Sequence, residues 1–217
     1  MINVNNDFGQ ALSAGMKDAA PKLGLQLISE YNFGMGDRQF GSIVASVKKD
    51  DPEVIYVSGY FFNGGPLVAQ LRAGGVTAPI VGTEGFDTAN FVQIAKEAAE
   101  GVIITTSLDR DTTDPTMRKF IDDYKKRFNV GAEMVAASTH TAVNVLVEAI
   151  RKVGIEDSTK LRNEIGATKN MPSAAGTITF NSSREVYKAA QIQIIKNGEF
   201  KRFAVIDDPV LLAPPTY

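Results

Sequence analysis

The most informative stretch of the sequence is residues 53–87, EVIYVSGYFFNGGPLVAQLRAGGVTAPIVGTEGFD. Two apolar runs within it, 54–57 and 79–81, each stop at small or glycine residues, and a segment with helical spacing of apolar residues lies between them. A strand, a helix and a second strand of these lengths form a βαβ unit, in which the two strands are parallel. The stretch therefore predicts an α/β protein.

Short polar and glycine-containing segments follow both predicted strands at their carboxyl ends. Residues 58–60 are Ser-Gly-Tyr, and residues 83–85 are Thr-Glu-Gly. In an open α/β sheet, ligands bind in the crevice beyond the carboxyl ends of the strands. A tyrosine and a glutamate at two such ends, beside glycines that let a ligand approach the backbone, predict a small-molecule site.

The alternation of strands and helices continues on both sides of this stretch. We expect further strands at Ile2–Val4, Leu23–Tyr31 and 101–106, and helices that begin after the capping residues Asn5–Asp7, Asp37 and Asp114. The first strand is short, since strands usually have about five or six residues, and we expect that its beginning is missing. The pattern predicts a doubly wound, mostly parallel sheet with the flavodoxin-like strand order 2-1-3-4-5.

The pattern changes after Gly131. Residues 134–153 predict one long helix with an apolar stripe, and Ser158 is expected to cap another helix, but neither has a sheet of its own to cover. Strand-like segments follow at 176–180, 189–195 and 199–205, and Lys-Asn-Gly at 196–198 predicts a hairpin between the last two. The terminal residues 211–215 are expected to be extended.

These patterns suggest a division of the chain into three parts. We expect an α/β ligand-binding lobe at 1–130, a helical segment at 131–175, and return strands with a C-terminal tail at 176–217 that complete the lobe. A chain of 217 residues is long enough to bury a substantial core.

The composition is that of an ordinary globular protein, with 44% hydrophobic residues and a net charge of −2. That charge, without a basic stripe, argues against nucleic acid as a partner. The absence of cysteine excludes disulfides and thiolate metal sites. No apolar run approaches the length of a membrane span.

The sequence also lacks the residues that catalysis or metal binding would need. His140 is the only histidine, so a histidine-based metal site or catalytic triad has no partners, and a surface or packing role is expected for it. No phosphate loop and no GxSxG motif occurs. We therefore expect a protein that is not an enzyme and that has no cofactor and no metal.

The predicted site combines Phe8, Tyr60 and Glu84, which follow the first, third and fourth strands. A carboxylate among aromatic rings suits a ligand with an ammonium group, because a charge-assisted hydrogen bond contributes about 1.5–3 kcal/mol and an aromatic face adds about 0.5–2 kcal/mol. Packing is the stronger alternative for Phe8, and Tyr60 could pack with its two neighbouring phenylalanines. Glu84 stands between a threonine and a glycine at the end of a predicted strand and not on the exposed face of a helix, which favours a role in ligand binding.

Four segments of the chain resemble a known family. They are DRQFGSIVASVKKDDPEVIYVSGYFFNGGPLVAQLRAGGVTAPIVGTEGF at 37–86, EGVIITTSLD at 100–109, ASTHTAVNVLVEAI at 137–150 and AGTITFN at 175–181. In combination they resemble the periplasmic binding proteins of branched-chain amino acid ABC transporters, the leucine-isoleucine-valine type within the type I binding-protein fold. The similarity extends over nearly the whole chain.

The resemblance implies a site at the same residues. In this family the second of two α/β lobes contributes an aromatic residue after its first strand, a tyrosine after its third, and a glutamate after its fourth that binds the α-ammonium group, which correspond to Phe8, Tyr60 and Glu84. The family usually has Tyr-Asp where this chain has His140-Thr141, and often tyrosine in place of Phe8.

The resemblance further implies a non-enzymatic, truncated solute-binding protein that lacks its first lobe. It would bind a hydrophobic or branched-chain amino acid in the periplasm and deliver it to an ABC transporter permease, although no signal peptide begins the sequence. Without the first lobe, the apolar stripe of 134–153 would be uncovered, which predicts self-association or a repositioned helix.

Two other functions remain open. The first alternative is a regulatory domain of the same fold that senses an amino acid or an amide. The second is a flavodoxin-like enzyme or response module, which the missing acidic cluster and phosphate loop disfavour.

Overall fold

The computed structural model describes residues 1–212 and divides into two compact units. The first unit contains Met1–Thr105 and Gln193–Lys201. The second contains Thr106–Ile192 and the described residues from Arg202 onward. The predicted roles of segments 1–130, 131–175 and 176–217 stay predictions, and residues 213–217 of the expected C-terminal tail lie outside the described residues.

The sheet contains five parallel strands in the order β2-β1-β3-β4-β5, and β8 and β9 extend it beyond β5. This confirms the predicted flavodoxin-like order. Ile2 pairs with Tyr31 of β2 on one side and with Val57 of β3 on the other, so β1 is a central strand. The strands are β1 (Ile2–Val4), β2 (Tyr31–Phe33), β3 (Ile55–Ser58), β4 (Ile80–Gly82), β5 (Ile103–Thr106), β8 (Ala190–Lys196) and β9 (Glu199–Ile206).

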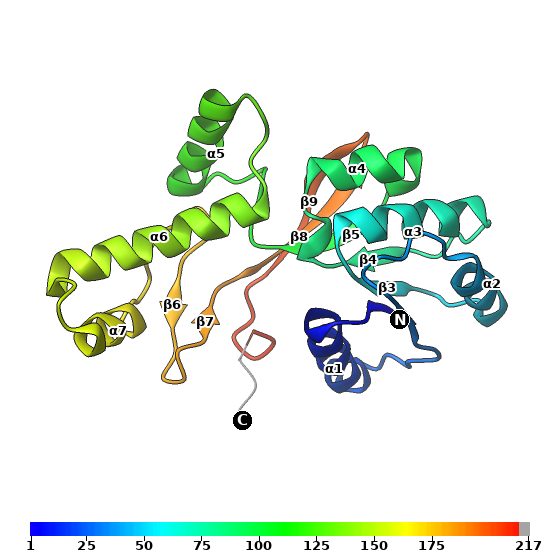
Figure 1. The fold of residues 1–217 in the computed structure, drawn as a ribbon, viewed down its shortest axis with the longest axis horizontal. Helices are drawn as coiled ribbons and strands as arrows, with labels where there is room; N and C mark the ends of the chain where they lie inside the picture. The colour runs from blue at the N-terminus through cyan, green and yellow to red at the C-terminus, as the bar shows by residue number, and fades with distance from the viewer. Residues whose placement is uncertain (213–217) are drawn as a thin grey trace. The chain divides into compact units, whose positions relative to one another are not determined.

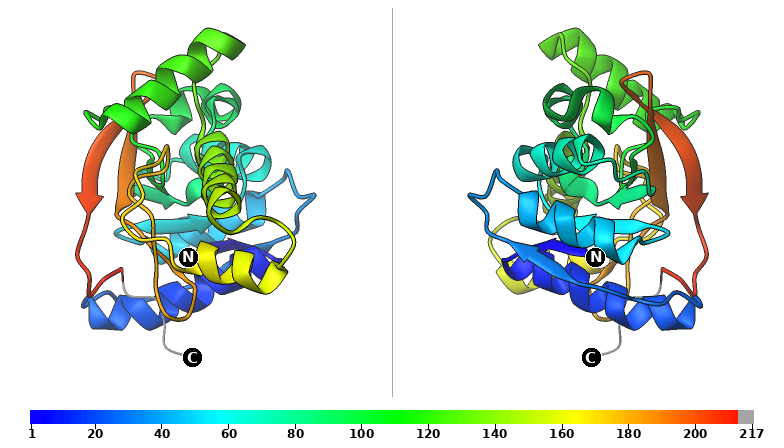
Figure 2. Two further views of the ribbon diagram at one scale, coloured as in Figure 1. Left: turned by 90° about the vertical axis from the view of Figure 1, so that its left-hand side faces the viewer. Right: turned by 90° about the vertical axis from the view of Figure 1, so that its right-hand side faces the viewer.

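Helices cover both faces of the sheet in the first unit. They are α1 (Asp7–Lys22), α2 (Gly41–Asp50), α3 (Phe61–Ala73) and α4 (Ala89–Ala95), with short 3-10 turns η1 (Glu84–Phe86) and η2 (Lys96–Ala99). Right-handed crossovers place α1 on one face and α2, α3 and α4 on the other, as Figures 1 and 2 show. The main core lies between these layers and includes Ile2, Val57, Leu67 and Ile80, all without exposed surface.

Phe86 is one of the largest fully buried side chains and lies two residues after Glu84 of the predicted site. Its ring is fully buried and stacks on Phe91 with 4.4 Å between ring centroids. A Cβ at Gly64 would lie 2.1 Å from this ring, and one at Gly82 would lie 2.4 Å from it. Two glycines therefore make room for the ring that fixes η1.

The second unit is built mainly from α5 (Pro115–Phe128), α6 (Met134–Val153) and α7 (Ser158–Gly166). Two short antiparallel strands, β6 (Thr179–Phe180) and β7 (Val186–Tyr187), complete it. Its core is small and centres on Leu108, Met117 and Ala137. The buried carboxylate of Asp109 is paired with Arg202, which ties β9 to the loop after β5.

Several predicted ends of elements are confirmed. Asp114 caps α5, since its carboxylate accepts a hydrogen bond of 2.9 Å from the Met117 amide, and Pro115 occupies the first turn. The hairpin between β8 and β9 turns at Asn197 and Gly198, with φ angles of 53° and 74°. Positive φ at both residues is what a two-residue hairpin turn requires.

Other predicted ends are wrong. The second strand runs from Tyr31 rather than over Leu23–Tyr31, because β1 begins only at Ile2 and offers residues 25–29 no partner. Asp37 does not cap α2; its carboxylate accepts a hydrogen bond from the Gly34 amide instead. Asp157, not Ser158, caps α7, and β7 was not expected.

Gly9 on α1 provides a test of how closely helix and strand pack. A Cβ at Gly9 would lie 1.9 Å from the carbonyl oxygen of Val4, whereas a Cβ at Gly15 on the same helix would meet nothing within 4 Å. We expect Gly9→Ala to lower the free energy of unfolding by about 1–3 kcal/mol through overpacking. Gly15→Ala should raise it by about 0.5–1 kcal/mol, because it lowers the entropy of the unfolded chain. Urea unfolding of both variants measures the difference, and equal effects would contradict the observed contact.

Candidate functional site

The candidate site lies at the carboxyl ends of β1, β3 and β4. These strands are parallel neighbours in the sheet, so the loops that follow them emerge at one edge. Phe8 lies in the first turn of α1, Tyr60 directly before α3 and Glu84 in η1, and all three residues are half-buried. The structure therefore places the three predicted residues directly after neighbouring strands.

Phe8 and Tyr60 are in direct contact. Their rings stack with 5.1 Å between centroids and 29° between planes. Phe8 lies in the first turn of α1, which Asn6 caps by accepting a hydrogen bond of 2.9 Å from the Gly9 amide. Tyr60 directly precedes α3, and its amide donates to Asn63 Oδ1 at 2.9 Å. Each ring is thus held at the start of a helix.

The aromatic contact continues beyond Tyr60. Phe62 also stacks on the tyrosine, with 5.6 Å between ring centroids and 2° between planes, and the guanidinium of Arg38 lies 5.2 Å from the centre of the Phe62 ring. Asn6 Nδ2 lies 3.4 Å from Tyr60 Oη and donates to it, which leaves the tyrosine O–H as a donor. Phe8, Tyr60, Phe62 and Arg38 are thus linked by successive contacts into one row of side chains.

Glu84 is placed by the close packing of the next residue. A Cβ at Gly85 would lie 2.0 Å from the carbonyl oxygen of Gly59 and 3.3 Å from Tyr60 Cα, so the loop of Glu84 lies against the loop of Tyr60. Among residues 1–212, no side chain donates a hydrogen bond or forms an ion pair with the Glu84 carboxylate. The carboxylate is therefore available to a ligand.

The charge of Glu84 acts on a neighbouring strand. Burial first, and the negative charge of Glu84 second, raise the pKa of the Tyr56 hydroxyl to about 12. Tyr56 lies on β3, two residues before the loop that carries Tyr60. The glutamate is thus close enough to the sheet to disfavour a second negative charge there.

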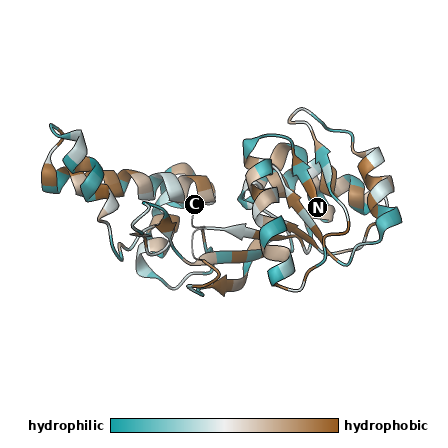
Figure 3. Cartoon of the chain, turned by 90° about the horizontal axis from the view of Figure 1, so that it is seen from below, coloured by the Kyte–Doolittle hydropathy of each residue, from teal (hydrophilic) through white to brown (hydrophobic). Residues whose placement is uncertain are grey.

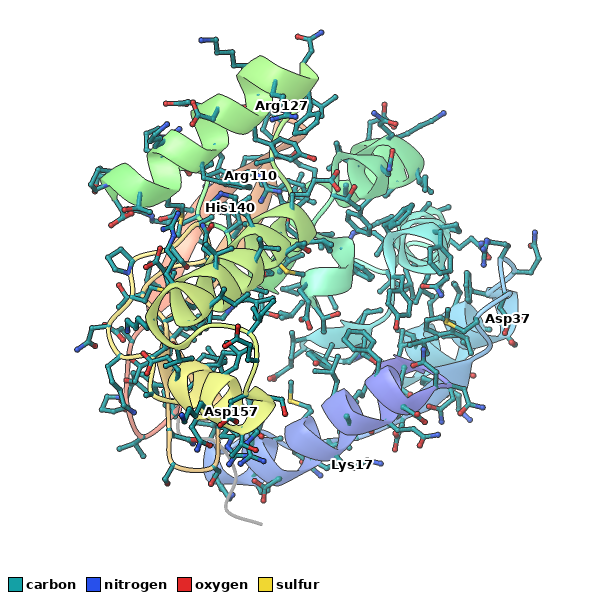
Figure 4. All side chains as sticks on the ribbon, turned by 60° about the vertical axis from the view of Figure 1, so that its left-hand side comes forward. Lys17, Asp37, Arg110, Arg127, His140 and Asp157 are labelled. Atoms are coloured by element: carbon teal, nitrogen blue, oxygen red, sulfur yellow. The ribbon has the colours of Figure 1, made fainter. Side chains whose placement is uncertain are left out.

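Two other carboxylates in the first unit are already engaged. Glu30 accepts hydrogen bonds from Ser13 at 2.8 Å and Asn3 at 3.0 Å, and pairs with Lys17 of α1 (Figure 4) at 2.6 Å. The hydrogen bond from Lys17 is the main cause that lowers the pKa of Glu30 below its usual range. Asp50 accepts from the hydroxyls of Ser29 and Tyr31. Glu84 differs from both in having an open carboxylate.

The remaining motifs have structural explanations. His140 is exposed on α6, where its ring lies 4.9 Å from Phe120 and its Nδ1 lies 3.2 Å from Asn144 Nδ2 (Figure 4). Over residues 1–212, no three His, Cys, Asp or Glu side chains gather in a group able to hold a metal ion. No helix in that range is long and apolar enough to cross a membrane.

Sequence reasoning missed part of the row of side chains. Asn6 was expected only as a cap, and Phe62 only as packing, whereas both contact Tyr60. Arg38 was not identified because it is distant in sequence and lies in another loop, between β2 and α2. A position next to a strand end could have indicated Asn6, but no local pattern indicates the Arg38 contact.

The link between Glu84 and Tyr56 can be tested without a ligand. Glu84→Gln removes the charge, so the pKa of Tyr56 should fall, and it should stay above 10 because burial is the larger cause. An alkaline titration of tyrosinate absorbance, with a Tyr56→Phe variant to identify the signal, measures this pKa. Glu97→Gln, at an exposed position of the same unit, is the control. An unchanged titration in Glu84→Gln would mean that the carboxylate lies away from the sheet.

The chain matches a known family over most of its length. A family described as periplasmic binding protein matches residues 1–198. Leu/Ile/Val-binding protein homolog 3 of Brucella melitensis is 27% identical over 187 residues, which are 86% of this chain and 50% of that protein. A leucine-, isoleucine-, valine-, threonine- and alanine-binding protein of Pseudomonas aeruginosa is 22% identical over 86% of this chain and 49% of its own length.

Solved structures show the same fold. The leucine-binding protein LivK of Thermotoga maritima superposes with a TM-score of 0.88 and 28% identity, over 94% of this chain and 60% of that one. LivJ of Streptococcus pneumoniae, solved with isoleucine, superposes with a TM-score of 0.81 and 23% identity, over 94% of this chain and 58% of that one. This similarity supports the fold alone. The chain spans about half the length of the curated relatives it matches. By the match over residues 1–198, the chain belongs to the periplasmic binding protein family.

Proposed function

We propose that this chain is a non-enzymatic solute-binding protein that binds a hydrophobic or branched-chain amino acid at the edge formed by Phe8, Tyr60 and Glu84. The open carboxylate of Glu84, packed against the loop of an aromatic stack, carries the proposal. Relatives whose names describe binding of leucine, isoleucine and valine support the ligand class.

In this proposal Glu84 binds the ammonium group of the amino acid. An ionised hydrogen-bond partner contributes about 1.5–3 kcal/mol, and the ring of Tyr60 adds attraction to the cation. The ligand carboxylate needs donors, and among these three residues only Tyr60 has a side chain that can donate, through its O–H. The three residues therefore form a half-site, selective for the amine end and weak for the acid end.

The rest of the proposed function follows the family. A binding protein of this kind works in the periplasm and hands its amino acid to the permease of an ABC transporter. We propose both for this protein, on the support of the family match and the relatives.

A titration with three ligands of similar shape tests the half-site. Leucine and 3-methylbutylamine both carry an ammonium group, whereas 4-methylpentanoate carries only the carboxylate. Because Glu84 recognises the amine, we expect the first two to bind with similar affinity and 4-methylpentanoate not to bind. Ligand-detected NMR at millimolar concentrations measures weak binding of this kind.

The matched variants identify the group responsible. Glu84→Gln should weaken leucine binding by roughly 10- to 100-fold, the equivalent of about 1.5–3 kcal/mol, whereas Glu97→Gln should leave it unchanged. Equal binding of 4-methylpentanoate and leucine would overturn the site. Binding of 3-methylbutanamide in preference to leucine would favour an amide-sensing domain instead.

We also propose that the second unit self-associates through α6. Val135, Val143 and Leu146 lie on one side of this helix and are 65%, 53% and 41% exposed, and Figure 3 shows hydrophobic residues along its length. A groove of about 1000 Å³ lies between α5 and α6 and is lined by the rings of Phe120, Tyr124 and Phe128. Exposed apolar surface of this extent favours coverage by a second copy of the chain.

Sedimentation over a range of concentrations tests self-association. The wild-type mass should rise with concentration, because burying the apolar stripe releases it from water. The double variant Val143→Lys/Leu146→Lys should remain a monomer, whereas Leu23→Lys, at an exposed apolar position of the first unit, should behave as wild type. A wild-type protein that stays monomeric at the highest concentration would exclude this interface.

A further inference from the structure

Arg38 carries a positive charge at the same edge of the sheet as the candidate site. It is exposed in the loop between β2 and α2, and its guanidinium carbon lies 5.2 Å from the centre of the Phe62 ring. No carboxylate among residues 1–212 forms an ion pair with it. A guanidinium that is held on an aromatic ring without an anionic partner is a group that a ligand anion can use.

The backbone of Arg38 is fixed to α3. Gln70 of that helix donates to the Arg38 carbonyl at 2.8 Å and accepts a hydrogen bond of 2.7 Å from the Phe40 amide. The same helix carries Phe62 in its first turn. One helix therefore holds both the loop of Arg38 and the ring that its side chain contacts.

Two carbonyls of the loop decide which donors of Arg38 remain. Its Nη1 donates to the carbonyls of Met35 at 3.2 Å and Asp37 at 2.7 Å, whereas Nε and Nη2 donate to no acceptor among residues 1–212. Nε–H and Nη2–H are parallel, and such a pair matches the two oxygens of a carboxylate. Arg202 uses the same two nitrogens to hold the carboxylate of Asp109. The free edge of Arg38 is therefore of the kind that binds a carboxylate.

The strand order separates this positive charge from Glu84. Arg38 follows β2 and Glu84 follows β4, and β1 and β3 lie between these two strands. Neighbouring strands are about 4.8 Å apart, so the ends of β2 and β4 are about 14 Å apart. The loop of Glu84 contacts that of Tyr60, and the rings of Tyr60 and Phe62 connect it to Arg38. A ligand that meets both charges needs its own charges at opposite ends of an apolar chain, not on one carbon as in an α-amino acid.

We infer that this edge of the sheet binds extended zwitterions, namely ω-amino acids with an apolar chain, in addition to α-amino acids, and that Arg38 binds their carboxylate. The inference rests on the proposed function, because Glu84 binds the amine of both classes. The methylene chain of the ligand lies along the stacked rings of Tyr60 and Phe62, where it is removed from water. A peptide of the same length fits less well, since ring faces offer its amide group no hydrogen-bond partner.

Ligand-detected NMR with matched pairs of ligands tests this inference. 6-Aminohexanoate is an isomer of leucine, and hexylamine has the same chain without the carboxylate; 8-aminooctanoate and octylamine form a longer pair. Within a pair both chains lose similar conformational freedom on binding, so the carboxylate decides the difference in affinity. At least one of the two ω-amino acids should bind roughly 10- to 100-fold more tightly than its amine.

Variants of Arg38 assign the gain to its side chain. Arg38→Gln, at an exposed position, should reduce the affinity for that ω-amino acid to the affinity for its amine, and binding of leucine and of the amine should not change. Arg38→Lys keeps the charge but loses the parallel pair of N–H groups, so it should retain only part of the gain. Lys48→Gln removes an exposed charge of α2 and should leave all affinities unchanged.

The outcomes separate this inference from the half-site on which it rests. Equal affinity of each ω-amino acid and its amine would overturn the role of Arg38 and leave the half-site intact, because leucine would still bind through Glu84. A gain that persists in Arg38→Gln would also overturn it, since another group would then bind the carboxylate. If neither leucine nor the amines bind, the half-site itself is wrong, and the role of Arg38 is wrong with it.

Discussion

The position of Phe86 between two glycines is the contact on which the candidate site depends. Its ring fills the space that side chains at Gly64 and Gly82 would otherwise occupy, and it stacks on Phe91 in the core. This fixes the short turn η1 to the sheet and to α3 together. Glu84 begins that turn, so a charged side chain at the surface is positioned by packing in the interior. A core contact of this kind is rigid, because interiors are close-packed and cannot shift one ring without moving its neighbours.

The same contact explains why an open carboxylate remains in place without a partner. Glu30 and Asp50 are held by hydrogen bonds from their own surroundings and are therefore satisfied. Glu84 is held through its backbone instead, by Gly85 against Gly59 and by Phe86 below. These contacts hold Glu84 in place without using its carboxylate oxygens as hydrogen-bond acceptors. The stacked rings of Phe8, Tyr60 and Phe62, with Arg38 at the end of the row, provide a flat surface beside the charge of Glu84.

Most of the sheet, and the placement of Phe8, Tyr60 and Glu84 after neighbouring strands, could be predicted from the sequence, because the relevant signals are local. Strand ends marked by glycine, the Asp114-Pro115 helix start and the Asn197-Gly198 turn each act within a few residues. The errors occurred where distant parts decide the outcome. Residues 25–29 have the alternation of a strand but no partner beside them, and Asp37 bonds a loop amide rather than a helix. The contacts of Phe62 and Arg38 likewise depend on how three loops meet, which no single segment encodes.

The order of the strands has a consequence for how the chain is synthesised. β8 pairs beside β5, and the amide of Ile195 donates to the carbonyl of Val102, although Thr106–Ile192 of the second unit lie between them in the sequence. On the ribosome, β5 therefore remains an open edge strand until β8 has been made. Open edges invite pairing with other chains, so the edge of β5 is exposed to such pairing throughout the synthesis of residues 107–189.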